Sequence, residues 1–342
     1  MSGPDPLRVG FLGAGFIATM HSKLLRAAGA SIERAGVFDC DAERTQQFAA
    51  ASGHRICGSE GEVLDTCDAV IVCTWTSEHR RLVEAAAARG LAVLCEKPLA
   101  TTLADAQAML ACVGAAGIVN QVDLVLRFIP RWVMAAELTR NAEAGRLMAV
   151  VFRDDQYIPI QGQYASTWRA DVTRAGAGVL LEHSVHDLDV LELIGGPITT
   201  VRAHTSNFHE IAGIEDVATA MFGFANGAHA TLTTVWHDNL SRPSGRHVEI
   251  ICERRVITLS GDDFAGPISW QDSDGATDSL QGDALDAAAA PLLTMGPNPD
   301  VAFVRAAIDN TPAYPDFALA VRAQTIAHAC YRSAAADATL HV

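Results

Sequence analysis

The sequence is short of basic residues. It has 25 lysines and arginines against 40 aspartates and glutamates, which gives a formal net charge of -15 over 342 residues. A surface of this sign repels a phosphate backbone, and this argues against nucleic acid as a main partner. The charge still allows one dinucleotide to bind, because the backbone N–H groups at a helix N-terminus attract phosphate locally.

A long apolar segment is also absent. No stretch reaches the roughly 18 apolar residues of a membrane-spanning helix, so we expect no membrane association. The first residues, MSGPDPLRVGF, do not have the basic region and apolar segment of a secretory signal peptide. We therefore expect the protein in the cytoplasm.

The sequence lacks the cysteine spacings of a disulfide framework or a zinc site. The eight cysteines form no Cys-x-x-Cys pair, and no cluster of histidine and cysteine has the spacing of a zinc site. In a reducing cytosol we expect them to serve as small apolar residues. We therefore predict neither a disulfide framework nor a metal.

The sequence does have enough apolar residues, 49%, for a sizeable core, and its length suggests two domains. In residues 1–125, short apolar runs at 7–12, 32–40, 68–73 and 91–95 alternate with helical segments. This alternation is typical of a parallel sheet that helices cover on both faces. We therefore predict that residues 1–125 form an α/β domain.

The pattern changes in residues 126–342. Alternating runs follow a predicted helix at 130–144, and one of them carries Asn226-Gly227, a strong hairpin signal. Another helix is predicted at 182–194, so we expect an antiparallel sheet with helices on one face. Residues 261–300 are rich in Gly, Asp, Ala and Pro, and we interpret them as an excursion or lid.

A glycine-rich turn lies between the first predicted strand and the helix that follows it. Residues 13–18 read Gly-Ala-Gly-Phe-Ile-Ala, a G-x-G-x-x-A pattern in the strand–turn–helix context of dinucleotide-binding domains. Gly13 permits the tight turn, Gly15 lets a pyrophosphate approach the backbone, and Ala18 allows the helix to pack closely on the sheet. A glycine turn that binds no nucleotide is the alternative. The residues expected at the cofactor are Gly13, Gly15, Phe16, Ile17 and Ala18.

The second predicted strand ends in Asp39, 21 residues after Ala18. A carboxylate at this place accepts hydrogen bonds from both hydroxyls of the adenosine ribose and repels a 2′-phosphate, which favours NAD over NADP. Asp39 could instead cap the following helix, although Asp41 is better placed for that role. Cys40 and Asp41 offer no cation to a 2′-phosphate.

A second group of polar residues lies in GAGVLLEHSVHDLDVLELIGG, residues 176–196. Glu182 and His186 are four positions apart, so they share one face of the predicted helix. A carboxylate beside an imidazole can orient it and raise its basicity. A structural histidine and a metal site are the alternatives, but no third metal ligand is evident nearby.

Lys97 follows an apolar run in VLCEKPLATT, residues 93–102. Nicotinamide chemistry on an alcohol requires a group that takes the hydroxyl proton as hydride leaves the carbon. A lysine can polarise the oxygen and a histidine can accept the proton. Lys97 and His186 are candidates for this pair if the two domains meet over the cofactor. A solvated ion pair of Glu96 with Lys97 is the structural alternative.

Several motifs together resemble the glucose–fructose oxidoreductase/inositol dehydrogenase/rhizopine-catabolism (Gfo/Idh/MocA) family. The resemblance runs over nearly the whole chain, and its motifs include GFLGAGFIATMH, VCTWTSEH, CEKPLA, STWRAD and GAGVLLEHSVHDLD. It implies an α/β Rossmann domain in residues 1–125 and an α+β domain with an open, mostly antiparallel sheet in residues 126–342. In this family the open sheet often forms the oligomer interface, so we expect a homodimer or homotetramer.

The resemblance also implies roles for individual residues. Lys97 matches the catalytic lysine, His186 the proton-transferring histidine, and Glu182 the carboxylate four positions before that histidine. Other positions match residues at the cofactor. They are Thr74 and His79 near the nicotinamide half, Glu96 on the ribose or carboxamide side, and Trp168 and Arg169, a pair that borders the cofactor.

The chain departs from the family at three positions, two of them in these motifs. Glu182 stands where the family usually has Asp, Trp75 where it often has Pro, and Leu126 where a polar residue is common. One extra methylene moves a carboxylate by about 1 Å, which is enough to change what it touches. These departures bear on the substrate more than on the type of reaction.

We therefore predict an NAD-dependent oxidoreductase that transfers hydride between nicotinamide C4 and a secondary alcohol or ketone of a sugar, sugar derivative or cyclitol. The alternatives are an NADP-linked reductase of a sugar ketone or imine and a non-catalytic dinucleotide-binding regulatory protein. The intact pair of Lys97 and His186 favours the enzyme, because a sensor has no reason to keep both residues.

Overall fold

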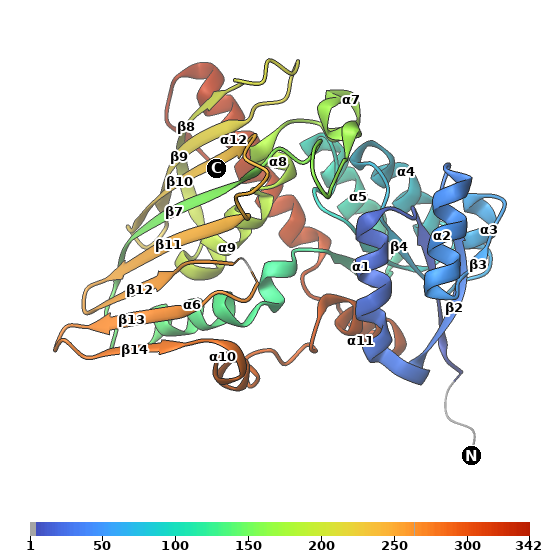
Figure 1. Cartoon of the computed structure of the whole chain (residues 1–342), viewed down its shortest axis with the longest axis horizontal. Helices are drawn as coiled ribbons and strands as arrows, with labels where there is room; N and C mark the ends of the chain where they lie inside the picture. Colours follow the sequence, from blue (N-terminus) through green and yellow to red (C-terminus); the bar gives the residue numbers. More distant parts are fainter. Residues whose placement is uncertain (1–4, 263) are drawn as a thin grey trace. The chain divides into compact units, whose positions relative to one another are not determined.

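The computed structural model describes residues 5–262 and 264–342 and divides into two compact units. The first unit contains Met1–Leu124 and Met295–Val321, and the second contains Val125–Thr294 and Arg322–Val342. Figure 1 labels many of their helices and strands. None of the described helices is both long and apolar enough to cross a membrane.

A six-stranded parallel sheet forms the centre of the first unit, in the order β3-β2-β1-β4-β5-β6. The strand order reverses at β1, as in the doubly wound sheets of dinucleotide-binding domains. The central strands are continuous apolar runs because both of their faces are covered. The strands are β1 (Leu7–Leu12), β2 (Ile32–Phe38), β3 (Arg55–Ile56), β4 (Ala69–Val72), β5 (Ala92–Cys95) and β6 (Asn120–Val122).

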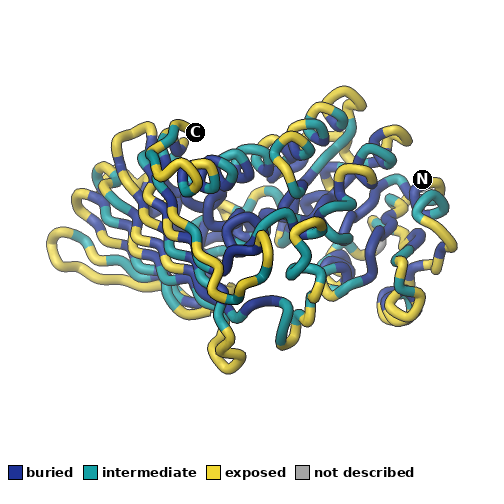
Figure 2. The backbone as a smooth tube through the Cα atoms, turned by 90° about the horizontal axis from the view of Figure 1, so that it is seen from above, coloured by how far each residue is buried: buried dark blue, intermediate teal, exposed yellow. Residues whose placement is uncertain are grey.

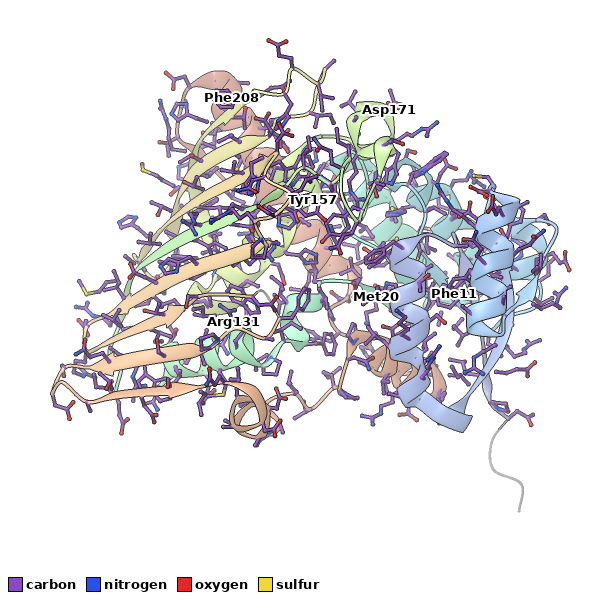
Figure 3. The ribbon with its side chains drawn as sticks, in the orientation of Figure 1. Phe11, Met20, Arg131, Tyr157, Asp171 and Phe208 are labelled. Carbon is purple, nitrogen blue, oxygen red and sulfur yellow. The ribbon has the colours of Figure 1, made fainter. Side chains whose placement is uncertain are left out.

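Two apolar clusters pack on opposite faces of this sheet. Val72 of β4 belongs to the cluster with α3, α4 and α5, whereas its neighbour Ile71 belongs to the cluster with α1, α2 and α11. Phe11 of β1, labelled in Figure 3, lies in the second cluster with its ring 5.1 Å from that of Phe48. The helices are α1 (Phe16–Leu24), α2 (Ala42–Ser52), α3 (Glu60–Leu64), α4 (Thr76–Ala87), α5 (Leu103–Ala116) and α11 (Pro299–Asp309), with a 3-10 helix at Leu25–Ser31.

A segment from late in the chain also belongs to the first unit. Phe303 and Val304 of α11 are buried in the cluster around β1, and Gln121 Nε2 donates to the carbonyl oxygen of Pro299 at 2.8 Å. The division expected from the sequence, at residues 125 and 126, therefore differs from the structure for residues 295–321. The change in strand pattern near residue 125 marks where the chain leaves the first unit, but it cannot show that a later helix returns.

A nine-stranded sheet forms the second unit, in the order β14-β13-β12-β11-β7-β10-β9-β8-β15. β7 and β10 pair in parallel, whereas the other described neighbours pair antiparallel. This arrangement confirms the mostly antiparallel sheet. The strands are β7 (Leu147–Tyr157), β8 (Ile198–Ser206), β9 (Val217–Phe224), β10 (His229–His237), β11 (Gly245–Cys252), β12 (Arg255–Leu259), β13 (Ile268–Asp272), β14 (Thr277–Leu280) and β15 (Leu340–His341).

Helices pack on one face of this sheet. Buried side chains of α6, α9 and α12 share one apolar cluster with inward side chains of the strands, and Trp132 of α6 stacks on Phe152 of β7 at 5.7 Å. Buried and exposed residues alternate along the strands (Figure 2), as they do when only one face of a sheet is covered. The helices are α6 (Pro130–Arg140), α7 (Val172–Ala175), α8 (Val179–Glu182), α9 (Val185–Gly195), α10 (Gly282–Ala289) and α12 (Phe317–Ala336), and 3-10 helices lie at Val125–Phe128 and Thr167–Ala170.

The hairpin predicted at Asn226-Gly227 is present. The two residues join β9 to β10, the Asn226 side chain accepts the backbone N–H of Ala228 at 3.0 Å, and Gly227 has a φ of +88°. The interpretation of residues 261–300 as a lid is wrong. β13 and β14 extend the sheet at its edge, and α10 buries Leu285 and Ala289 in the apolar cluster.

Candidate active site

The glycine turn joins β1 to α1 as the sequence predicts. Gly13 has a φ of +93°, and a Cβ on it would lie 2.4 Å from the carbonyl oxygen of Cys73, so only glycine fits. Gly15 precedes the first turn of α1, and no atom lies within 4 Å of the position that a Cβ would take. This open backbone at a helix N-terminus fits the pyrophosphate of a dinucleotide.

The other three residues of the motif form the start of α1. Ala18 is fully buried and packs with the strands. Ile17 packs partly against the same cluster, whereas Phe16 is 53% exposed. Their assignment to the cofactor stays a prediction.

Asp39 follows β2 and contacts the glycine turn directly. Its Oδ2 atom accepts the backbone N–H of Ala14 at 2.8 Å, and its Oδ1 atom accepts that of Asp41 at 2.9 Å. Asp41, in turn, caps α2 by accepting the N–H groups of Glu43 and Arg44. The cap role therefore belongs to Asp41, and the Asp39 carboxylate is held beside the turn with lone pairs left for ribose hydroxyls.

His79 connects the loops that follow β4 and β5. Its Nδ1 atom lies 3.1 Å from the carbonyl oxygen of Pro98 and 3.3 Å from that of Leu99, and its Nε2 atom lies 3.3 Å from that of Thr74. The ring is buried, and burial lowers the pKa of His79 despite the nearby charge of Glu96. The structure thus places the His79 ring between the loops that carry Thr74 and Lys97. A neutral ring has one N–H, which it can donate to one of the two loops.

Lys97 stands at the carboxyl end of β5, and the Lys97-Pro98 peptide bond is cis. The side chain of the preceding Glu96 turns inward and is 7% exposed. Its Oε2 atom accepts the backbone N–H of Lys97 at 3.0 Å, so Glu96 is a buried part of the loop and not the solvated partner of a surface ion pair.

Glu96 belongs to a buried polar cluster that the sequence pattern does not reveal. His21 of α1 lies between two carboxylates, with Nε2 3.2 Å from Glu96 Oε1 and Nδ1 2.9 Å from Asp300 Oδ1. Asp123, after β6, adds a third buried carboxyl group. One ligand atom each of His21, Glu96 and Asp123 lies within 4.8 Å of the others, which is close enough for a metal ion.

The charges of this cluster affect one another. Burial disfavours the charged imidazole of His21, but the charge of Asp300 and the hydrogen bonds outweigh it and raise the pKa of His21 well above its usual value. Burial and then the charge of Glu96 raise the pKa of Asp123 to about 7. Burial opposes ionisation of Glu96 as well, but the contact with His21 lowers the pKa of Glu96.

In the second unit, the predicted helix at 182–194 is broken. α8 ends at Glu182 and α9 begins at Val185, so Glu182 and His186 do not share the face of one continuous helix. Glu182 Oε1 instead accepts a hydrogen bond from Arg169 Nε at 2.6 Å, and the guanidinium of Arg169 lies 4.5 Å from the ring centre of Trp168. The structure thus brings three predicted site residues, Trp168, Arg169 and Glu182, together.

A second buried polar cluster surrounds the start of α9. His183 Nε2 lies 2.7 Å from Asp154 Oδ2, and Arg246 Nε donates to Asp187 Oδ1 at 2.6 Å. Burial raises the pKa of Asp187 well above its usual value, and the nearby Arg246 and His183 lower that of Asp154 despite burial. Asp154 of β7 and Arg246 of β11 thus connect these two strands to the start of α9. α9 is the helix that carries the buried His186.

The predicted site residues therefore form two groups, one in each unit. The glycine turn, Asp39, Thr74, His79, Glu96 and Lys97 belong to the first unit, and Trp168, Arg169, Glu182 and His186 to the second. The sequence pattern does not reveal His21, Asp123 and Asp300 as site residues. His21 carried a weak signal, since it lies three positions after Ala18 on the helix of the glycine motif, whereas Asp300 carried none.

The sequence matches known protein families over most of its length. A family model described as an oxidoreductase family with an NAD-binding Rossmann fold matches residues 7–124, and the model of the Gfo/Idh/MocA C-terminal domain matches residues 132–258. The chain is also 32% identical over 263 residues to the 1,5-anhydro-D-fructose reductase of Ensifer adhaerens, a match that covers 73% of this chain and 77% of that protein. The chain belongs to the Gfo/Idh/MocA family.

Other members of the Gfo/Idh/MocA family are similar over shorter parts or in fold. The inositol 2-dehydrogenase of Cereibacter sphaeroides is 29% identical over 230 residues, which are 65% of this chain and 64% of that protein, less than two thirds of its length. A levoglucosan dehydrogenase in complex with NADH and levoglucosan has the same fold, with a TM-score of 0.87 over 98% of this chain and 99% of that one at 21% identity.

These comparisons confirm three predictions. The family is Gfo/Idh/MocA, the fold combines a Rossmann domain with a mostly antiparallel sheet, and the Rossmann domain of this family member is an NAD-binding domain.

Proposed function

We propose that the protein is an NAD-dependent dehydrogenase of a sugar, a sugar derivative or a cyclitol. One arrangement carries the proposal: Lys97 follows β5 at the edge of the sheet where the glycine turn follows β1. β1, β4 and β5 are parallel neighbours, so β5 lies about 10 Å from β1. Ligands of doubly wound sheets bind at this edge.

Lys97 and His186 have complementary roles in the proposed reaction. Bound NAD supplies a nicotinamide C4 that accepts hydride from the substrate carbon. The ammonium of Lys97 donates a hydrogen bond to the substrate oxygen, and the imidazole of His186 takes the hydroxyl proton. Arg169 holds the Glu182 carboxylate in place, so that this group orients His186 or a substrate hydroxyl.

The names of the relatives support the substrate class. An inositol, an anhydro-fructose and levoglucosan are all rings that carry several hydroxyl groups. The departures at Glu182, Trp75 and Leu126 bear on which substrate of this class the protein uses. NADP is the less favoured cofactor because the Asp39 carboxylate would repel a 2′-phosphate.

A cofactor titration followed by a substrate screen tests the proposal. We expect calorimetry to show that NAD binds more tightly than NADP, and we expect at least one sugar or cyclitol to reduce NAD in a spectrophotometric screen. Tight binding of NAD without turnover of any polyol, sugar or sugar ketone would favour the regulatory protein. Turnover only with NADPH and a ketone or imine would favour the reductase.

We also propose that the protein works in the cytoplasm as a homodimer or homotetramer. The uncovered face of the nine-stranded sheet exposes Val151 of β7, Met221 of β9 and Val256 of β12. Light scattering should give the mass of a dimer or tetramer, and Val151→Asp with Met221→Asp should shift it to that of a monomer. A monomeric wild-type protein would contradict this part of the proposal.

A further inference from the structure

Four separate elements of the first unit supply the residues of the buried cluster beside Lys97. His21 comes from α1, Glu96 from the end of β5, Asp123 from the end of β6 and Asp300 from the first turn of α11. His21 is 2% exposed and Asp300 is fully buried. Such a concentration of ionisable groups in a core is costly unless the charges compensate one another.

Counting hydrogen-bond donors indicates the charge of His21. Both ring nitrogens face carboxylate oxygens, at 2.9 Å for Asp300 and 3.2 Å for Glu96. An ionised carboxylate only accepts hydrogen bonds, and a neutral imidazole has a single N–H to donate. Both contacts are satisfied together when His21 carries two protons, and the negative charges on either side favour this imidazolium.

The imidazolium is linked to Lys97 through Glu96. One oxygen of Glu96 faces His21, and the other accepts the backbone N–H of Lys97 at 3.0 Å. On the other side of the loop, His79 contacts the carbonyl oxygens of Pro98 and Leu99. The backbone before the Lys97 side chain is thus linked to His21 through Glu96, and the backbone after it contacts His79 directly.

We propose that His21 and Asp300 are positioning residues of the reaction, which act through Glu96 to hold Lys97 where it reaches the substrate oxygen. This proposal rests on the proposed function. Asp300 sets the orientation of the His21 ring, His21 sets the position of the Glu96 carboxylate, and Glu96 holds the amide of Lys97. An attachment of this kind matters because a displacement of about 1 Å at a reacting group can reduce a rate about 100-fold.

Asp123 adds a further buried carboxyl group to the same cluster. Its Oδ1 atom is buried and has no hydrogen-bond partner, so a charge on Asp123 would have to be balanced by His21 and Lys97. A bound metal ion is the other arrangement that would satisfy His21, Glu96 and Asp123 together. In that case the ion would replace the proton on His21 Nε2, and the two arrangements can be told apart by experiment.

A double-mutant cycle with Lys97 tests the positioning role. We expect His21→Gln and Asp300→Asn each to lower kcat at least tenfold and to leave the Kd of NAD within threefold of wild type. The kcat of the His21→Gln/Asp300→Asn double variant should be no lower than that of the less active single variant. In a Lys97→Met background, His21→Gln should change kcat less than twofold, because the residue that it positions is gone. An equal loss in both backgrounds would overturn the proposal.

His54→Gln is the matched control. His54 is a buried histidine of the same unit whose pKa is lowered by burial to about 4, so it is neutral, and its Nδ1 atom contacts Ser52. Its loss should affect stability in the way that any buried histidine does, but it should leave kcat within twofold. A tenfold loss of kcat in His54→Gln would show that the effect of His21 is not specific.

Three measurements do not depend on turnover. Nitrogen-15 NMR of labelled protein should show both ring nitrogens of His21 protonated up to pH 8, and mass spectrometry should find no stoichiometric metal; a neutral ring or one bound metal ion per chain would overturn the proposal. Hydrogen exchange at the Lys97 amide should become at least tenfold faster in His21→Gln, while exchange at the Leu94 amide should not change. Unchanged exchange at Lys97 would refute the positioning role.

Failure of the proposed function would give a different result, because the wild-type protein itself would then show no turnover.

Discussion

The Oδ2 atom of Asp39 accepts the backbone N–H of Ala14 at 2.8 Å, so the residue that follows β2 is attached to the glycine turn that follows β1. The two strands are parallel neighbours, and their carboxyl ends therefore meet at one edge of the sheet. This contact holds in place the carboxylate to which we attribute the proposed preference for NAD.

Replacement of Asp39 should weaken the preference for NAD. We expect Asp39→Ala to raise the Kd of NAD about tenfold, in line with the loss of a charged hydrogen-bond acceptor, and to bring the kcat/KM values for NAD and NADP closer together. Asp41→Ala is the control, because it removes the α2 cap two residues away and should cost about 1 kcal/mol of stability without changing the cofactor ratio. An unchanged ratio in Asp39→Ala would exclude the ribose role.

Loss of the Lys97 ammonium should lower the rate of the chemical step without weakening the binding of NAD. We expect Lys97→Met to lower kcat at least about 100-fold and to leave the Kd of NAD within a few-fold of wild type, because it removes a group that acts on the substrate oxygen. The chain has a second lysine, the exposed Lys23 of α1, and Lys23→Met should have no effect on kcat. If NAD binding fell as much as kcat, Lys97 would be a cofactor contact instead.

Gly178 should tolerate no side chain. A Cβ on it would lie 1.9 Å from the carbonyl oxygen of Glu215, whose carboxylate accepts the N–H groups of Gly178 at 2.8 Å and Leu180 at 2.9 Å just before Glu182. We expect Gly178→Ala to lower the free energy of unfolding by about 3 kcal/mol, because backbone atoms have to move apart. Chemical denaturation checks this value. Gly114→Ala on α5 has open space and should be neutral or stabilising.

Asp123 should make stability depend on pH. Its pKa rises from 3.8 to about 7 on folding, first through burial and then through the charge of Glu96. The stabilisation associated with its neutral form is complete below the unfolded pKa near 4 and is lost as the pH rises through 7. Each pKa unit corresponds to about 1.36 kcal/mol, so the free energy of unfolding should fall by up to about 4 kcal/mol over this pH range.

Asp123→Asn should remove this dependence, since an amide stays neutral. Denaturation of both proteins at pH 5 and pH 8.5 should show that the variant gains stability relative to wild type at the higher pH. A constant difference between the two proteins would contradict a raised pKa. The groups that act on Asp123 are Glu96 and Lys97 after β5, His21 of α1, Cys73 after β4 and Asp300 of α11.

Features set by neighbouring residues could be predicted from the sequence. The turn at Gly13, the cap at Asp41 and the hairpin at Asn226-Gly227 each depend on a few consecutive residues, and the structure has all three. The position of Lys97 at the end of β5 follows from one apolar run and the charged residues after it.

Features that join distant segments could not be predicted. His21 and Asp300 are 279 positions apart and meet because α11 returns to the first sheet. Glu215 binds the backbone at the start of α8 from another part of the chain. The helix breaks between α8 and α9, whereas the i, i+4 spacing of Glu182 and His186 indicated one continuous helix. Residues 261–300 lacked a strand pattern because β14 is an edge strand with mostly exposed side chains.

The most direct test of the proposed chemistry is a crystal structure of the protein with NAD and a polyol that it oxidises. We expect the Lys97 Nζ atom and the His186 ring to lie within about 3 Å of the same substrate oxygen, above one face of the nicotinamide ring. A complex in which a layer of water or more separates either group from that oxygen would contradict the joint action of Lys97 and His186.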